Sequence, residues 1–381
     1  MMLRALVPVL ASVVFMSAWA AEGVTDTSIK IGQAAALTGP AAGLGMGMQQ
    51  GLQACFTQVN AAGGVNGRKL ELVSIDDAYD PDQAVEATTK LIKEDKVFCL
   101  AGYVGTPTAK VVMPIVSEAK VPIVGLFTGA MLLRQPVNQF VLNVRASYDD
   151  ETEALVEHLT KDLSAKSVAV FYQNDSFGQA GLSGTDKALK KRGMEVVAKG
   201  TFERGTVAVK SGLAALLPAK PDAVIMVGTY KPVAAFLKEA KEAGLTATFC
   251  TVSFVGTENL IAEAGLAGDG VVISQVVPSP QDASVPVVKD YQAALAAVPG
   301  AKPGYVSLEG YVSGRVLVEG LKAAGKALER EALVSAMEGM KKLDVGGMPM
   351  TYAADDHQGS DAVYMTIIKT GAAVTVQSLA K

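Results

Sequence analysis

The chain has 381 residues, of which 50% are hydrophobic and 19% are charged. This length suggests about two domains, and so apolar a composition excludes a largely disordered chain. The formal charge of -4 and the lack of a basic stripe argue against a nucleic-acid partner. With only 2 histidines and 3 cysteines, a zinc centre or a Cys/His catalytic cluster is nearly excluded.

Residues 1–20 are predicted to be a secretion signal. A positive start at Arg4 precedes an apolar run over 5–16, and Ala18-Trp19-Ala20 fits the small-x-small cleavage rule. The run is shorter than the roughly 20 apolar residues that span a bilayer. We therefore expect cleavage after Ala20 and an exported, periplasmic protein that has lost its only tryptophan, Trp19.

Short apolar runs alternate with helix-length segments along the rest of the chain. Such runs are typical of strands buried in a parallel sheet. We expect strands over 29–37, 70–75, 97–104, 121–127, 168–172, 223–227, 247–252 and 271–277. A helix is expected over 232–243, where apolar residues recur every three or four positions and Gly244 follows. The alternation predicts an α/β fold with helices on both faces of parallel sheets.

Local signals mark where helices begin. Two helices are predicted to start at a capping residue before proline, at Asp80-Pro81 and at Thr106-Pro107. The glycines over 43–51 follow the first strand, but their spacing does not fit a dinucleotide fingerprint. We interpret this glycine cluster as a close-packed turn.

No pairing of nucleophile and base is recognisable in the sequence. The chain has no GxSxG elbow, and His158 and His357 lie in settings typical of the protein surface. Acidic pairs such as Asp76-Asp77 are explained by strand ends and helix caps. We therefore predict that the protein is not an enzyme and needs neither a cofactor nor a metal ion.

Three loops that follow predicted strands are rich in glycine and hydroxyl groups, over 37–40, 103–108 and 127–129. Tyr103 and Phe127 begin the second and third of them. Ligands of open α/β sheets lie beyond the carboxyl ends of the strands. We predict that Thr106 caps a helix whose amide hydrogens face the crevice, with the Thr128 hydroxyl and the Gly129 amide as further donors. Such a place suits a carboxylate.

Export would place the cysteines in a compartment where disulfides form. Cys55 and Cys99 can pair if they lie in one lobe, but burial as free thiols fits their apolar surroundings equally well. Cys250 is expected to be unpaired in either case.

Several runs, in their order and spacing, resemble the exported solute-binding proteins of ABC importers, and most closely the leucine/isoleucine/valine-binding type. They include Leu37-Thr38-Gly39-Pro40 and Asn174-Asp175-Ser176-Phe177-Gly178, and further runs lie over 29–32, 59–68, 76–84, 102–106 and 240–245. The resemblance covers essentially the whole chain after the leader. It implies the type I periplasmic binding protein fold, with two Rossmann-like lobes joined by three crossovers that act as a hinge.

On this resemblance the N-terminal lobe comprises 24–146 and 277–354, and the C-terminal lobe comprises 147–276 and 355–381. The ligand is expected to be clamped between them. The resemblance implies a carboxylate anchor at Thr106, joined by the residues Phe127, Thr128 and Gly129. Other pocket positions that it implies are Leu44, Phe177, Thr229 and Tyr230.

The chain departs from the family at the partner of the ligand's ammonium group. The family commonly has glutamate in the loop after 247–252, where this chain has Ser253. Because an unpaired buried charge costs several kcal/mol, an α-amino group would depend on Asp150, near a hinge, or on neutral oxygens. Branched-chain or other amino acids are the expected ligands. An amide, or an aromatic or short-chain carboxylate without an amine, is the alternative.

The resemblance also implies the protein's partners. A monomer would deliver its small-molecule ligand to an ABC permease in the inner membrane. The alternative is a periplasmic ligand sensor that feeds a membrane receptor.

Overall fold

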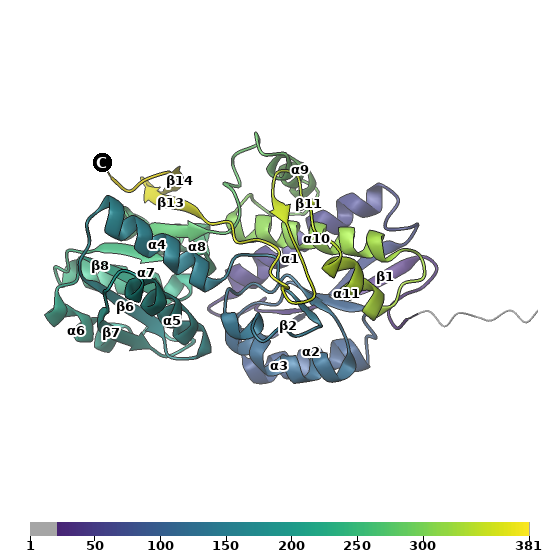
Figure 1. Ribbon diagram of the computed structural model, residues 1–381, viewed down its shortest axis with the longest axis horizontal. Helices are drawn as coiled ribbons and strands as arrows, with labels where there is room; N and C mark the ends of the chain where they lie inside the picture. Colours follow the sequence, from purple (N-terminus) through teal and green to yellow (C-terminus); the bar gives the residue numbers. More distant parts are fainter. Residues whose placement is uncertain (1–20, 381) are drawn as a thin grey trace, which may run out of the picture.

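The computed structural model describes residues 21–380, which form two α/β lobes side by side (Figure 1). The predicted leader, its cleavage site and Trp19 lie outside the described residues. Within residues 21–380, no helix combines the length and apolar character that a membrane span requires.

The first lobe is built on a parallel five-stranded sheet with the order β2-β1-β3-β4-β5. Its strands are β1 (Ser28–Ala35), β2 (Lys69–Asp76), β3 (Cys99–Ala101), β4 (Ile123–Val124) and β5 (Val141–Leu142). Its helices are α1 (Ala42–Ala61), α2 (Pro81–Lys93), α3 (Thr106–Ala119), η1 (Met131–Leu133), α9 (Pro286–Leu295), α10 (Tyr305–Ala324) and α11 (Arg330–Glu338). A small antiparallel pair, β11 (Leu343–Asp344) with β12 (Pro349–Met350), completes it.

The second lobe is built on a seven-stranded sheet with the order β14-β13-β10-β9-β8-β6-β7. Its strands are β6 (Val168–Gln173), β7 (Val196–Phe202), β8 (Ala223–Val227), β9 (Thr248–Thr251), β10 (Val272–Gln275), β13 (Tyr364–Lys369) and β14 (Ala372–Val376). Its helices are α4 (Tyr148–Asp162), α5 (Ser176–Lys190), α6 (Lys210–Leu216), η2 (Leu217–Ala219), α7 (Tyr230–Glu242), η3 (Ser253–Val255), α8 (Thr257–Ala264) and η4 (Gly265–Gly268). Two pairings in this sheet are antiparallel, β10 with β13 and β13 with β14, and the others are parallel.

The chain crosses between the lobes three times: from β5 to α4, from β10 to α9, and from β12 to β13. The last crossing carries the C-terminal hairpin, yellow in Figure 1, to the lobe that contains β6 to β10. Two lobes of mostly parallel sheets joined by three connections confirm the predicted fold class. The lobe limits near residues 146, 276 and 354 stay predictions.

Each predicted strand corresponds to an observed one, from β1 to β4 and at β6, β8, β9 and β10. Asp80 caps α2 as predicted, because its side chain accepts hydrogen bonds from the backbone nitrogens of Asp82 and Gln83. The apolar stripe of α7 is buried as predicted, although this helix begins at Tyr230 and not at 232.

The interpretation of the glycines over 43–51 as a turn is wrong, because they lie within α1. A Cβ atom at Gly51 would meet the carbonyl of Ser307 and lie 2.5 Å from the backbone nitrogen of Tyr311, both in α10. The glycines therefore let α1 pack directly on its neighbours. No phosphate-binding loop is needed to explain them.

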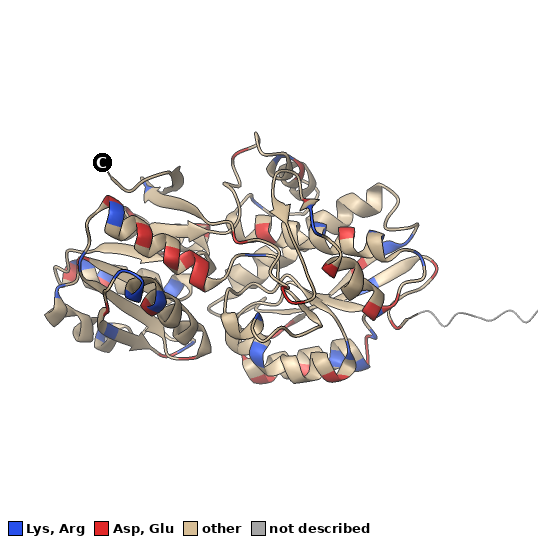
Figure 2. Cartoon of the chain, in the orientation of Figure 1, with Lys and Arg blue, Asp and Glu red and all other residues tan. Residues whose placement is uncertain are grey.

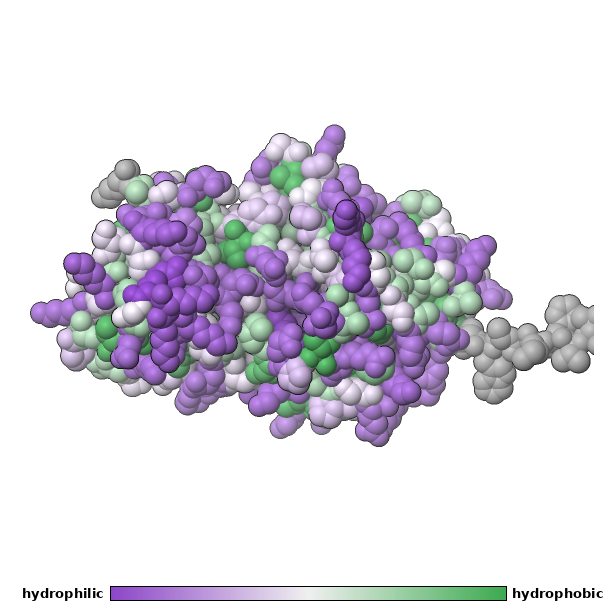
Figure 3. All heavy atoms as spheres, in the orientation of Figure 1, coloured by the Kyte–Doolittle hydropathy of each residue, from purple (hydrophilic) through white to green (hydrophobic). Residues whose placement is uncertain are grey.

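Charged and apolar residues are mixed over both lobes. Charged residues are spread along the helices, with several acidic ones in α4 (Figure 2). On this face apolar residues are scattered in small groups among polar ones (Figure 3).

Candidate functional site

Phe254, in η3, lies at the centre of an aromatic contact between the lobes. Its ring centroid is 4.5 Å from that of Phe177 in the same lobe. It is 5.1 Å from Phe127 and 6.3 Å from Tyr79, which both belong to the first lobe. All four side chains are buried. The structure thus brings the predicted residues Phe127 and Phe177 to one aromatic contact, together with two residues that the sequence analysis missed.

Two threonine hydroxyls lie beside this contact. The Oγ1 atoms of Thr106 and Thr128 are 2.7 Å apart, and both side chains are fully buried. Tyr148, the first residue of α4, packs against Gly129 and holds its ring 5.5 Å from Phe177. Its buried hydroxyl has no hydrogen-bond partner among residues 21–380. Burial raises the pKa of Tyr148 to about 12, so this group stays protonated and can donate to a ligand oxygen.

The predicted capping role of Thr106 is wrong. Gly105, at φ 103° and ψ 149°, is the N-cap of α3, and Thr106 is the first helical residue. A Cβ atom at Gly105 would collide with the Tyr79 ring, so a side chain cannot stand there. The cap therefore has no side-chain hydrogen bond, and the Thr106 hydroxyl pairs with Thr128 instead.

Leu44 and Tyr230, both predicted, contact the opposite lobe. The Tyr230 hydroxyl accepts a hydrogen bond from the backbone nitrogen of Gly43 at 3.2 Å. Leu44 is fully buried, and a Cβ atom at Gly256 would lie 2.5 Å from its Cδ2 atom. These contacts hold the start of α1 against α7 and α8.

Two other predicted residues point elsewhere. Tyr103 belongs to the core of the first lobe, where its hydroxyl bonds that of Thr88 at 3.1 Å. The carboxylate of Asp150 accepts from the backbone nitrogen and the hydroxyl of Ser147, at 2.9 and 2.6 Å. It also accepts from Gln358 at 3.0 Å. Asp150 therefore closes a capping box at the start of α4 and is not free to meet an ammonium group.

Ser253 joins a buried cluster of charges that the sequence analysis missed. Its backbone nitrogen donates to Glu151 at 2.8 Å, and its hydroxyl contacts both Glu151 and Arg145. Arg145 lies 2.5 Å from Glu151 and 3.3 Å from Glu309, which comes from α10. The hydroxyl of Ser274 donates to Glu151 at 2.6 Å. The backbone nitrogen and the hydroxyl of Ser253 are thus engaged in contacts within the protein.

The charged groups of this cluster shift one another's pKa values. Burial raises the pKa of Glu309 to about 7, and the Arg145 guanidinium opposes that rise. Burial lowers the pKa of Arg145, but the two carboxylates outweigh it and the net shift is upward. Burial also lowers the pKa of the neighbouring Arg134 to about 10, with Arg145 adding to the effect. A weak sequence signal existed, because Arg145 interrupts an apolar strand end six residues before Glu151.

A cavity of about 540 Å³ opens between the lobes beside Tyr79. Tyr79 and Asp80 line it from the first lobe. Arg204, Lys231 and the predicted residue Thr229 line it from the second. Of the predicted site residues, Thr229 therefore faces open space, whereas Thr106, Thr128 and Phe177 lie at the closed contact.

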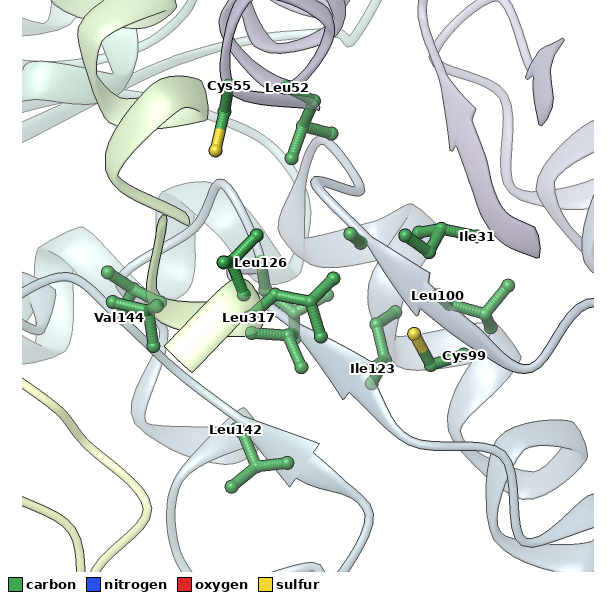
Figure 4. Close-up of a cluster of buried hydrophobic side chains, with 14 of the residues drawn as sticks. Ile31, Leu52, Cys55, Cys99, Leu100, Ile123, Leu126, Leu142, Val144 and Leu317 are labelled. Carbon is green, nitrogen blue, oxygen red and sulfur yellow. The ribbon is translucent and has the colours of Figure 1, made fainter. Parts of the chain in front are cut away.

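The cysteines are free thiols, so the alternative of a Cys55–Cys99 disulfide is not realised. Figure 4 shows Cys55 on α1 and Cys99 on β3 within the core of the first lobe. Burial raises the pKa of both thiols to about 12. Cys250 is buried and unpaired, as expected.

His357 does not have the expected surface position. It is buried, with Nδ1 2.9 Å from the carbonyl of Val141 and Nε2 3.2 Å from Glu338. Over the described range, no group of three or more His, Cys, Asp or Glu side chains is placed to hold a metal ion.

Comparison with known proteins shows which family the chain matches. The model of a family described as "Periplasmic binding protein" matches residues 28–373. An "Amino acid binding protein" of Pseudomonas aeruginosa is 27% identical over 62% of this chain and 63% of its own length. The chain thus spans less than two thirds of that relative.

Two solved structures share the fold over nearly the whole chain. A "possible leucine/isoleucine/valine-binding protein" from Rhodopirellula baltica is 36% identical with a TM-score of 0.87, covering 92% of this chain and 96% of its own. A "fatty acid ABC transporter substrate-binding protein" from Thermomonospora curvata is 26% identical with a TM-score of 0.84, covering 94% and 93%.

Proposed function

The chain belongs to the periplasmic binding protein family, and we propose that it is the solute-binding component of an ABC importer that closes its two lobes over a small carboxylate ligand. One observation carries the proposal: hydroxyl and aromatic side chains of both lobes converge at one contact. Thr106 and Thr128 come from the first lobe, and Tyr148 and Phe177 come from the second. If the two lobes move apart about the three connections, these groups become exposed together.

The polar end of the ligand is proposed to displace the hydrogen bond between Thr106 and Thr128. A carboxylate oxygen could accept from both hydroxyls and from that of Tyr148, which has no partner within the described range. Hydrogen bonds to a charged group contribute about 1.5–3 kcal/mol each. The apolar part of the ligand would pack on Phe177 and Phe254, where burial of a leucine-sized side chain contributes about 1.5–3 kcal/mol.

An amino acid is the first ligand class that we propose. The P. aeruginosa relative is named for amino acids, and the R. baltica structure is described as a possible binder of branched-chain ones. An ammonium group would need neutral oxygens, because Asp150 and Glu151 are engaged in the protein's own contacts.

A carboxylate without an amine is the second class, and one observation favours it. Glu151 is paired with Arg145 and accepts from Ser253 and Ser274, so a buried ammonium would find no spare charge there. The T. curvata structure, described as a fatty acid binder, belongs to the same fold and offers a precedent by its description.

Export and delivery complete the proposal. The leader over 1–20 would send the chain to the periplasm, with cleavage after Ala20. The closed, monomeric protein would then present its ligand to a permease in the inner membrane, because closure changes the surface that both lobes display together.

A binding screen tests this function. Thermal shift followed by calorimetry on the purified protein should find a ligand among amino acids, amides and small carboxylates. We expect Thr106→Val and Tyr148→Phe each to weaken that ligand about tenfold, since each removes one hydrogen bond to a charged oxygen.

Thr160→Val is the matched control, because the Thr160 hydroxyl bonds only the α4 backbone among the described residues. It should leave affinity unchanged. Unaltered affinity in both site variants would remove the hydroxyl group from the proposed site.

A further inference from the structure

The cavity beside Tyr79 lies at the mouth of the cleft and is lined by basic side chains of the second lobe. We infer that this cavity binds a second anionic group of the ligand, so that the preferred ligand class is a dicarboxylate. The inference rests on the proposed function, because it takes the cleft between the lobes as the ligand site.

Arg204 is the first of the two cations. Its guanidinium lies 5.8 Å from the Tyr79 ring centroid, and its Nη1 atom donates to the Tyr79 carbonyl at 3.3 Å. Its Nε atom forms an ion pair with Asp175 at 3.6 Å, which is longer than a hydrogen bond. The remaining nitrogen, Nη2, makes no hydrogen bond within the described chain. Arg204 is thus fixed in position with donors left for a carboxylate.

Lys231 and Thr229 supply the second part of the cavity wall. Lys231, in the first turn of α7, makes no ion pair or side-chain hydrogen bond within residues 21–380. Thr229 is the N-cap of the same helix and is only 4% exposed, yet its side chain makes no capping bond. A hydroxyl that makes no hydrogen bond within the described chain and lines a cavity beside an unpaired cation and a helix N-terminus is typical of an anion site.

Two acids lie near this wall, because Asp80 lines the cavity from the first lobe and Asp175 forms an ion pair with Arg204 at 3.6 Å. The carboxylate of Asp80 accepts from the backbone nitrogens of Asp82 and Gln83 and so serves the start of α2. Asp175 likewise accepts from Phe177 and Gly178 at the start of α5. Both acids are held by helix N-termini, which favour a carboxylate. Lys231 is left without an acidic partner within residues 21–380, and Arg204 keeps its Nη2 donor for a ligand.

Tyr79 connects this cavity with the inner site. One side of the residue packs on Phe254, and Arg204 lies over its ring. A ligand that holds one carboxylate at Thr106 and Thr128 and runs along the aromatic rings would place its far end at the cavity. A second carboxylate there would meet Arg204 and Lys231, whereas a methyl group would leave Lys231 without an ionic partner.

Pairs of ligands with one carbon skeleton test the inference. Adipate and hexanoate form one pair, and 2-aminoadipate and norleucine form the other. We expect the diacid of at least one pair to bind the purified protein about tenfold more tightly than its partner in calorimetry. Equal or tighter binding of both monoacids overturns the inference and leaves the proposed function standing. Absence of binding by every member overturns the inference, because no diacid of this length is then preferred, whereas the proposed function is decided by the wider ligand screen.

Variants then assign the preference to residues. Arg204→Gln and Lys231→Gln should each weaken the diacid about tenfold and the monoacid less than about twofold, whereas Arg204→Lys should keep most of the preference. Lys241→Gln, at the exposed far end of α7, is the matched control and should change neither. Equal weakening of both ligands by Lys231→Gln would overturn the inference, because it would mean that the cavity does not distinguish the second charge.

Discussion

Asp77 is a carboxylic acid buried without full hydrogen bonding. Its Oδ1 atom accepts from the backbone nitrogen of Tyr79 at 2.9 Å, whereas its buried Oδ2 atom has no partner within the described chain. Burial raises the pKa of Asp77 to about 7. Since the unfolded chain has the ordinary value of about 4, the folded protein binds this proton more tightly. Asp77 therefore makes stability fall as pH rises from about 4 to about 7.

Asp77→Asn should remove this contribution, because the amide does not ionise. We expect the free energy of unfolding of the wild type, relative to that of the variant, to fall as the pH rises from about 4 to about 7. Urea unfolding at several pH values measures the difference. Parallel pH profiles for the two proteins would contradict the prediction.

The sequence predicts which residues approach the site better than it predicts where each side chain points. Thr106 and Thr128 follow neighbouring strands of one sheet, so their proximity could be expected. Tyr103 belongs to the same loop as Thr106 but turns into the core. The pairing of Arg145 with Glu309 could not be predicted, because the two residues are 164 positions apart along the chain.

The close contact of α1 with α10 depends on glycine at the level of the element. A Cβ atom at Gly51 would meet the Ser307 carbonyl and the Tyr311 nitrogen, neither of which can turn aside as a side chain does. In an exposed helix, alanine stabilises by up to about 1 kcal/mol over glycine. Overpacking costs about 1–3 kcal/mol or more, so the destabilisation by the clash should exceed the gain in helix propensity.

We therefore expect Gly51→Ala to lower the free energy of unfolding by about 1–3 kcal/mol in urea denaturation. Gly339→Ala is the control, because a Cβ atom there would lie 3.3 Å from its nearest neighbour, the Ala336 carbonyl. A change at Gly51 no larger than the change at Gly339 would mean that α1 shifts freely on α10.

Elements with a continuous apolar run were predictable, and the others were not. β8 is buried along its whole length, whereas β7 alternates between more and less exposed residues, with only two of them buried. β5 has two residues, too few for any period to be read. The hairpin of β13 and β14 lies at the sheet edge with several exposed residues, so nothing in its pattern predicted the one antiparallel addition.

At the scale of the molecule, Arg145 ties together elements from both lobes. It stands in the first connection, pairs with Glu151 of the second lobe and reaches Glu309 of the first. Its side chain is 1% exposed, so loss of the guanidinium would leave two buried carboxylates without a counter-charge. Breaking a buried pair by removing one partner costs about 3–5 kcal/mol.

Arg145→Met should therefore lower the free energy of unfolding by about 3–5 kcal/mol. Lys161→Met provides the comparison, because the Lys161–Glu157 pair is exposed and should contribute less than about 1 kcal/mol. Urea denaturation of both variants measures the contrast. Similar small losses would show that the two carboxylates become protonated without cost to the fold.

Closure of the lobes over a ligand can be followed at the mouth of the cleft. Val207 lines the cavity from the second lobe and is 57% exposed, so the larger side chain of tryptophan fits there without disturbing the core. Because the only tryptophan of the chain is Trp19, a protein prepared without residues 1–20 has no tryptophan emission of its own. Val207→Trp should change its emission when a ligand draws the lobes together, since the indole then loses water contact.

Val197→Trp is the matched control, because Val197 is 46% exposed on β7 and does not line the cavity. Its emission should stay constant over the same titration, and the midpoint at position 207 should agree with calorimetry. A response of equal size at both positions would point to a general effect of the ligand on the second lobe. Movement of one lobe against the other would then not be the cause, and the hinge mechanism would lose its support.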